Sequence, residues 1–147
     1  MLNWLKKLGV AGYASILGAI FSLVAMIIYI VNSTTGYLAG SSVNALPIIF
    51  AILAILLFAV KVALPEKLQN HWLDSFILLA AVVLLSVSIC VFVDARTDVA
   101  GNQWFIPGMA TDAQGACLSV AIAGVVFYVL AVVAAIVAGF CGTKKKA

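Results

Sequence analysis

Residues 75–93 read SFILLAAVVLLSVSICVFV and contain no charged side chain. A helix needs about 20 mostly apolar residues to cross a hydrocarbon core about 30 Å thick. The uncharged stretch 8–60 is long enough for two such helices, and the uncharged stretch 113–143 is long enough for one. The sequence of 147 residues therefore predicts four membrane-spanning helices.

The composition agrees with a membrane protein, because 66% of the residues are hydrophobic and only 9% are charged. Soluble domains are about half apolar and about one quarter charged. This balance excludes an ordinary soluble enzyme, a disordered tail and a nucleic-acid binder. We expect a lipid bilayer around the chain and no nucleic-acid partner.

A polar, glycine-rich segment at residues 32–45 divides the first uncharged stretch into two spans. We predict an all-α integral membrane protein in which residues 1–147 form a single membrane domain, a four-transmembrane-helix bundle. The predicted helices cover about 10–31, 46–64, 74–93 and 113–140, with outer loops at 32–45 and 94–112 and an inner loop at 65–73. Asn44, Asn70 and Thr111 are expected to cap the second, third and fourth helices.

The positive charges predict the orientation of the helices. Seven of the eight Lys and Arg residues fall on the side that holds both termini, and only Arg96 falls on the other side. Because cytoplasmic loops carry an excess of Lys and Arg, we predict cytoplasmic N- and C-termini. We expect a multi-pass protein of the plasma (cytoplasmic) membrane. The first apolar run is about 24 residues long, beyond the 7–15 of a signal peptide, so we expect it to remain as a span.

The two outer loops begin with similar residues. Segments 31–40 and 93–101 share Val, then Asn or Asp, then Thr three residues further on, and finally Ala-Gly. This pattern suggests two tandem, parallel-oriented helical hairpins related by an axis along the membrane normal. Coincidence among small, common residues is the alternative.

Small side chains at four-residue spacing let membrane helices approach closely. Such ridges occur in the first and fourth predicted helices, and we interpret them as helix-packing sites: Ala11, Ser15, Ala19, Ala131, Ala135 and Gly139. Frequent alanine in any membrane helix would give a similar pattern. We expect the first and fourth helices to make the tightest contacts.

We expect no ionisable side chain inside the four spans. Lys61 is assigned to the inner side, and Asp74 to the inner end of the third span at headgroup depth. The polar residues within the spans are mainly Ser and Tyr, and serine often bonds to its own helix backbone. A hydroxyl-lined path for a solute is the alternative reading of these side chains.

Chemical motifs are weak in this sequence. It has a single histidine, His71, and no CxxC pair, nucleophile–base arrangement or phosphate-binding glycine loop. We therefore predict no catalytic, cofactor-binding or metal site, and no enzymatic activity. Cys90 and Cys117 are expected at similar depth near the outer face, where a disulfide could join the third and fourth helices.

The outer loop 94–112 carries Asp94, Arg96, Asp98 and Asp112 around an apolar centre. Three carboxylates could bind calcium, but Arg96 lies between two of them and no EF-hand spacing is present. Local pairing of Arg96 with these acids is the expected arrangement.

The apolar centre of the same loop, Trp104, Phe105 and Ile106, is too apolar to remain in water. It could fold over the bundle or enter the outer interface, and we interpret it as a partner-docking segment. The leading functional hypothesis is a non-enzymatic small membrane protein that acts as a subunit or accessory of a larger membrane complex. The alternative is a homo-oligomeric channel or facilitator for a small neutral or hydrated solute, with a pore lined by Ser and Tyr hydroxyls. The expected partners are accordingly a larger membrane protein or copies of this chain.

Overall fold

The computed structural model describes residues 8–64 and 71–141. The described part is entirely helical apart from its connecting segments, and four helices are long and apolar enough to cross a membrane. The elements are α2 (Val10–Thr34), the short 3-10 helix η1 (Gly36–Leu38), α3 (Leu46–Ala63), α4 (His71–Asp94), α5 (Thr97–Trp104) and α6 (Asp112–Phe140). The prediction of an all-α protein with four long apolar spans is confirmed.

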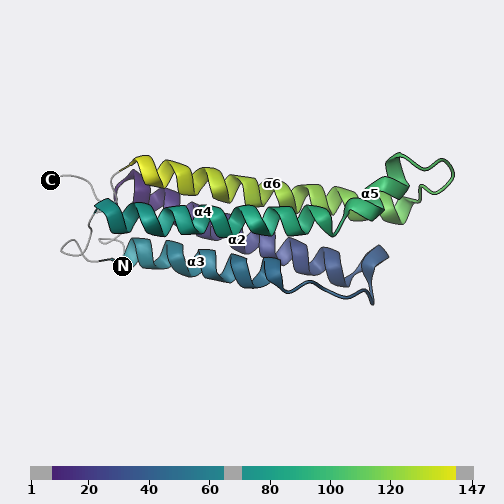
Figure 1. Cartoon of the computed structure of the whole chain (residues 1–147), viewed down its shortest axis with the longest axis horizontal. Coiled ribbons are helices and arrows are strands. Elements are labelled where there is room, and N and C mark those ends of the chain that lie inside the picture. Colours follow the sequence, from purple (N-terminus) through teal and green to yellow (C-terminus); the bar gives the residue numbers. More distant parts are fainter. Residues whose placement is uncertain (1–7, 65–70, 142–147) are drawn as a thin grey trace.

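The four long helices run up and down in an elongated bundle (Figure 1). The helix α2 packs against α3 and α6, and α4 packs against the same two helices, so each long helix has two neighbours. The most extensive interface joins α2 and α6, the two helices that carry the small-residue ridges. We call the end at which α2 begins and α6 ends the proximal end, and the opposite end, which carries η1 and α5, the distal end.

The helices begin and end where local chemistry satisfies their free backbone groups. The Thr111 hydroxyl accepts a hydrogen bond from the Gln114 backbone N–H (3.2 Å), which caps α6 as predicted. At α3 the cap position is Ala45, one residue later than predicted. The Asn44 side chain nevertheless accepts from the Leu46 N–H at 3.0 Å. The predicted cap Asn70 lies outside the described residues.

The bundle core combines small residues with a few large rings. Gly18 of α2 lies against the ring of Phe58 from α3, and Gly124 of α6 lies against the ring of Phe92 from α4. A Cβ at either glycine would stand 2.7 Å from the facing ring, so only glycine leaves room for it. Both rings are fully buried. Each ring therefore fills a notch that the absence of a side chain creates.

The predicted ridge residues occupy different depths. Ala11, Ser15, Ala131 and Ala135 are buried and Ala19 is half-buried. Gly139 is exposed, near the proximal end of α6. The ridge of the fourth helix therefore reaches the bundle interior over most of its length, but not at its last member.

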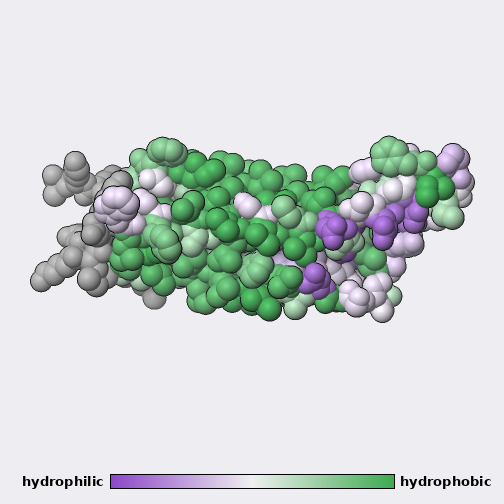
Figure 2. All heavy atoms as spheres, viewed as in Figure 1, coloured by the Kyte–Doolittle hydropathy of each residue, from purple (hydrophilic) through white to green (hydrophobic). Residues whose placement is uncertain are grey.

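The outer surface of the bundle is apolar. Figure 2 shows a broad hydrophobic band over the middle of the visible face, with hydrophilic residues gathered towards the distal end. The exposed large side chains of this band are mostly Leu, Ile, Val and Phe. Such a surface is stable against lipid tails but not in water, which supports a membrane protein.

The helices differ from the predicted ranges at several ends. α2 continues three residues beyond 31, and α4 begins three residues before 74, inside the predicted inner loop. Residues 65–70 of that loop lie outside the described part. The predicted outer loop 94–112 contains the additional helix α5. The cyclic order α2, α3, α4, α6 is compatible with two tandem hairpins, whose relation stays a prediction.

Candidate functional site

A buried arginine joins three elements at the distal end of the bundle. Arg96 lies between the end of α4 and the start of α5, and only 8% of it is exposed. Its Nε donates to Asn32 Oδ1 and its Nη2 donates to Ser33 Oγ, both at 2.6 Å. Asn32 and Ser33 belong to the last turn of α2. The guanidinium therefore ties the end of α2 to the α4–α5 junction.

Asn32 extends this connection to α6. Its Nδ2 donates to the Cys117 backbone carbonyl at 2.8 Å and lies 3.5 Å from the Cys117 Sγ. The amide oxygen of Asn32 thus accepts from Arg96, and its nitrogen donates to α6. This one buried side chain therefore connects the α4–α5 junction to α6.

Aromatic rings lie beneath the guanidinium. Its central carbon is 5.4 Å from the centre of the Phe92 ring and 5.8 Å from that of the Tyr29 ring. Phe92 meets Tyr29 edge-to-face at 4.9 Å between centroids and Tyr128 at 6.3 Å. Burial lowers the pKa of Arg96, and electrostatic interactions with Cys117 and Tyr29 act in the opposite direction. The group still carries its positive charge at any physiological pH.

The expected pairing of Arg96 with the neighbouring acids is wrong. Within the described residues, the structure contains a single ion pair, and Arg96 is not part of it. Asp94, Asp98 and Asp112 are all exposed. The guanidinium instead turns towards α2, where the buried Asn32 and Ser33 each accept one hydrogen bond from it, while the acids remain exposed. No group of three metal-binding side chains occurs in the described part of the chain, so the three acids do not form a calcium cage there.

The cysteines are not joined in the structure. Cys90 is exposed on α4, Cys117 is buried on α6, and both are free thiols. The Cys117 thiol lies 3.5 Å from the Asn32 amide nitrogen. The anticipated disulfide between α4 and α6 is therefore not formed.

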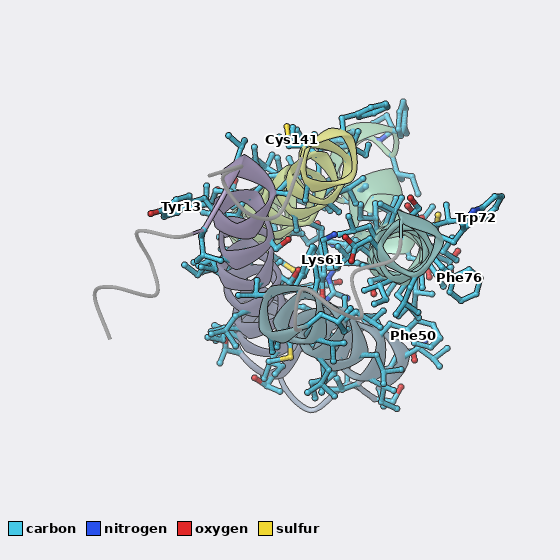
Figure 3. The ribbon with its side chains drawn as sticks, turned by 90° about the vertical axis from the view of Figure 1, so that its left-hand side faces the viewer. Tyr13, Phe50, Lys61, Trp72, Phe76 and Cys141 are labelled. Atoms are coloured by element: carbon cyan, nitrogen blue, oxygen red, sulfur yellow. The ribbon has the colours of Figure 1, made fainter. Side chains whose placement is uncertain are left out.

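The single ion pair lies at the proximal end, between α3 and α4. Lys61 Nζ is 2.6 Å from Asp74 Oδ2, and Lys61 is only 2% exposed. Figure 3, which looks onto this end, shows Lys61 between the helices, whereas Trp72 and Phe76 point away from the bundle. The expectation that no ionisable side chain lies inside the helices is wrong here. The last turn of α3 carries Lys61 on its inward face, where Asp74 compensates the charge.

The serines of the spans bond to their own helices. Ser15 donates to the Ala11 carbonyl at 2.8 Å, and Ser88 donates to the Leu84 carbonyl at 3.0 Å. Ser22 Oγ is buried without a hydrogen-bond partner among the described residues. Back-bonded hydroxyls of this kind serve the helix backbone and offer little to a passing solute.

The predicted docking residues stand at the distal tip. Trp104 ends α5, and Phe105 and Ile106 follow it in the turn that leads towards α6. Phe105 is 79% exposed and Trp104 is 60% exposed. Met109 in the same turn is also exposed. The apolar centre of the loop does not fold back over the bundle, so its surface is free for contact.

Sequence reasoning missed the two buried charges because their partners come from other helices. Asn32 is 64 residues from Arg96, and Asp74 is 13 residues from Lys61. For the Arg96 cluster, the sequence offers one signal only: a single Arg in a loop, together with an uncharged end of the neighbouring helix α2.

No family model, curated protein or solved structure matches the chain.

Proposed function

We propose that this chain is a non-enzymatic membrane protein that serves as a subunit or accessory of a larger membrane complex. We further propose that the distal tip, defined as Trp104, Phe105, Ile106 and Met109, docks on the larger partner. The observation that carries this proposal is that these four apolar side chains are exposed at the end of α5 and in the turn that follows it, at the distal end, where hydrophilic residues gather on the visible face (Figure 2).

The length of α6 supports a tip outside the hydrocarbon. With a rise of 1.5 Å per residue, its 29 residues extend about 43 Å, whereas the hydrocarbon core is about 30 Å thick. The tip lies beyond the distal end of α6 (Figure 1). When the apolar band fills the hydrocarbon, the tip therefore stands at or above the headgroups.

Exposed aromatic side chains at that height favour a protein contact. Burying a Phe side chain contributes about 1.5–3 kcal/mol relative to leaving it in water. The four apolar residues of the tip are all exposed and lie within six positions of the sequence, and aromatic residues are enriched among those that anchor interfaces. The exposed carboxylates of the same loop, Asp94, Asp98 and Asp112, disfavour the alternative in which the loop enters the lipid.

The orientation remains part of the proposal. We place the proximal end in the cytoplasm of a plasma membrane, because the lysine-rich segments of the sequence adjoin that end. Most of these lysines lie outside the described residues. The distal tip then faces the outside, where it would meet an outer domain or loop of its partner.

The channel alternative receives less support from the side chains. Its pore requires free hydroxyls, but Ser15 and Ser88 donate to their own helices. The interior of the bundle is filled by Tyr29, Phe92 and Tyr128 in its distal half. A pore between copies would have to use the apolar outer faces, which favour lipid.

Site-specific photocrosslinking in membranes of the natural host tests the proposal. A benzophenone amino acid at Phe105 should give one adduct with a larger polypeptide, and native mass spectrometry should find that polypeptide in stoichiometric complex with the chain. The same probe at Val129, an exposed mid-span residue of α6, is the control and should label mainly lipid.

The variant Phe105→Ser should release the larger polypeptide without unfolding the chain, because this side chain is 79% exposed. A ring of identical copies would instead support the channel. A monomer that gives no polypeptide adduct at Phe105, while the Val129 probe labels lipid, would contradict the accessory role.

A further inference from the structure

A small pocket opens beside Arg96 at the distal end. Its volume is about 140 Å³, and it lies between the end of α2, the connection from α2 to α3, and the α4–α5 junction. Its polar lining residues are Tyr29, Ser33, Ser41, Ser42, Asn44 and Arg96. The pocket is the most polar of the surface hollows described, because apolar surface dominates the lining of the others.

No carboxylate among the described residues forms an ion pair with Arg96. The guanidinium has five N–H donors, and three of its hydrogen bonds are formed, to Asn32 Oδ1, Ser33 Oγ and the Ala95 carbonyl. All three acceptors are neutral. Two N–H groups therefore remain, and Arg96, which is only 8% exposed, carries a full charge without a carboxylate partner among residues 8–64 and 71–141. Buried charges in proteins are normally paired, because isolated ones are costly to desolvate.

The remaining walls of the pocket are neutral and rich in hydroxyls. Ser41 and Ser42 are exposed at the mouth, so their O–H groups can turn inwards and donate. The Tyr29 hydroxyl already donates to the Asn44 carbonyl at 2.8 Å and helps to fix the loop. Asp94 and Asp98, which are close to Arg96 in sequence, do not line the pocket. The pocket thus presents one cation and several donors to a single small volume.

We propose that this pocket binds an anionic phosphate group, held by the free N–H donors of Arg96 and by the hydroxyls of Ser41 and Ser42. Arg donates to phosphate oxygens in a fork geometry, and a tetrahedral anion has enough oxygens to reach both walls. The volume is well below the roughly 300–1,000 Å³ of pockets for drug-sized ligands, so the site takes one headgroup-sized anion. The phosphate can belong to an anionic lipid, since the site lies where the apolar band ends, or to free phosphate in solution.

The test uses the full chain, purified in neutral detergent, and three probes: phosphatidylglycerol, phosphatidylcholine and inorganic phosphate. Native mass spectrometry measures retained lipid, and thermal unfolding measures stabilisation by each probe. The ligand is a lipid if the chain retains phosphatidylglycerol in preference to phosphatidylcholine and inorganic phosphate does not displace it. Stabilisation by inorganic phosphate alone identifies a soluble one.

Two substitutions at one position keep the test independent of folding. Ser42→Asp places a carboxylate at the mouth of the pocket and leaves Arg96 and its hydrogen bonds in place, so binding should weaken at least about tenfold. Ser42→Asn has nearly the volume of Ser42→Asp without its charge and keeps an N–H donor, so it should bind more weakly than the native chain but more tightly than Ser42→Asp. Arg96→Gln should abolish binding, and Arg96→Lys should retain part of it. The proposal is overturned if the native chain binds none of the probes, or if Ser42→Asp binds as tightly as Ser42→Asn.

Discussion

Replacing Gly124 by Ala should destabilise the bundle by a predictable amount. The added Cβ would stand 2.7 Å from Phe92 Cε1 and 2.9 Å from Ile28 Cγ2, whereas comfortable contacts between carbon atoms are about 3.5–4.0 Å. Phe92 cannot easily move, because it packs edge-to-face between Tyr29 and Tyr128. Overpacking of this kind costs about 1–3 kcal/mol.

Gly139→Ala is the matched control on the same helix. Its Cβ would lie 3.9 Å from Leu78 Cδ1, an ordinary contact. The gain in helix propensity, up to about 1 kcal/mol, is at least as large at Gly124 in the middle of α6 as at Gly139 in its last turn, so this difference opposes the expected destabilisation and cannot produce it. We expect Gly124→Ala to be less stable than Gly139→Ala by about 1–3 kcal/mol.

Reversible unfolding by increasing dodecyl sulfate in mixed micelles, followed by circular dichroism, measures this difference. The double variant Phe92→Leu, Gly124→Ala should lose less free energy of unfolding than the sum of the losses in the two single variants, because the smaller side chain at position 92 leaves room for the new Cβ. Equal stability of Gly124→Ala and Gly139→Ala would refute the notch as a packing constraint.

Three further predictions concern other parts of the bundle. Lys61→Met or Asp74→Leu alone should lower the free energy of unfolding by about 3 kcal/mol in the same assay, because each leaves a charge unpaired. The double variant should be more stable than the less stable single variant. Simple additivity of the two single effects would contradict the buried pair. Intact mass should be unchanged by reduction, and maleimide should label both Cys90 and Cys117 after unfolding without a reductant; a thiol that appears only after reduction would contradict the free state of both. Thr111→Ala should lower the stability of α6 by about 1 kcal/mol through loss of its cap, visible as faster amide hydrogen exchange in the first turn, and unchanged exchange there would show that the cap is dispensable.

The four spans could be predicted because they depend on local composition. An uncharged run such as 75–93 has no stable alternative to a helix in lipid, where every backbone group must be hydrogen-bonded within the segment. The short helix α5 could not be predicted in the same way. It is polar, contains Gly101 and Asn102, and depends on its contact with α6 for stability.

The candidate sites were less accessible to sequence reasoning, because they depend on which helices meet. Arg96 has acidic neighbours along the chain, but its actual partners lie at the end of α2. Likewise Lys61 is close enough to the end of its helix to be assigned to the cytoplasmic surface. Only the helical register shows that it points towards Asp74. The apolar tip, by contrast, is a continuous segment and could be recognised directly.

The two ring-in-glycine notches have a consequence for movement. Phe58 locks α3 onto α2 through Gly18, and Phe92 locks α4 onto α6 through Gly124, with Ile28 of α2 against the same position. An axial slide of one helix by one turn, about 5.4 Å, would lift a ring out of its notch and force it against a side chain. We therefore expect the bundle to transmit no piston-like displacement between its two ends. Any signal or strain that crosses it would travel as a tilt of whole helices around these two fixed points.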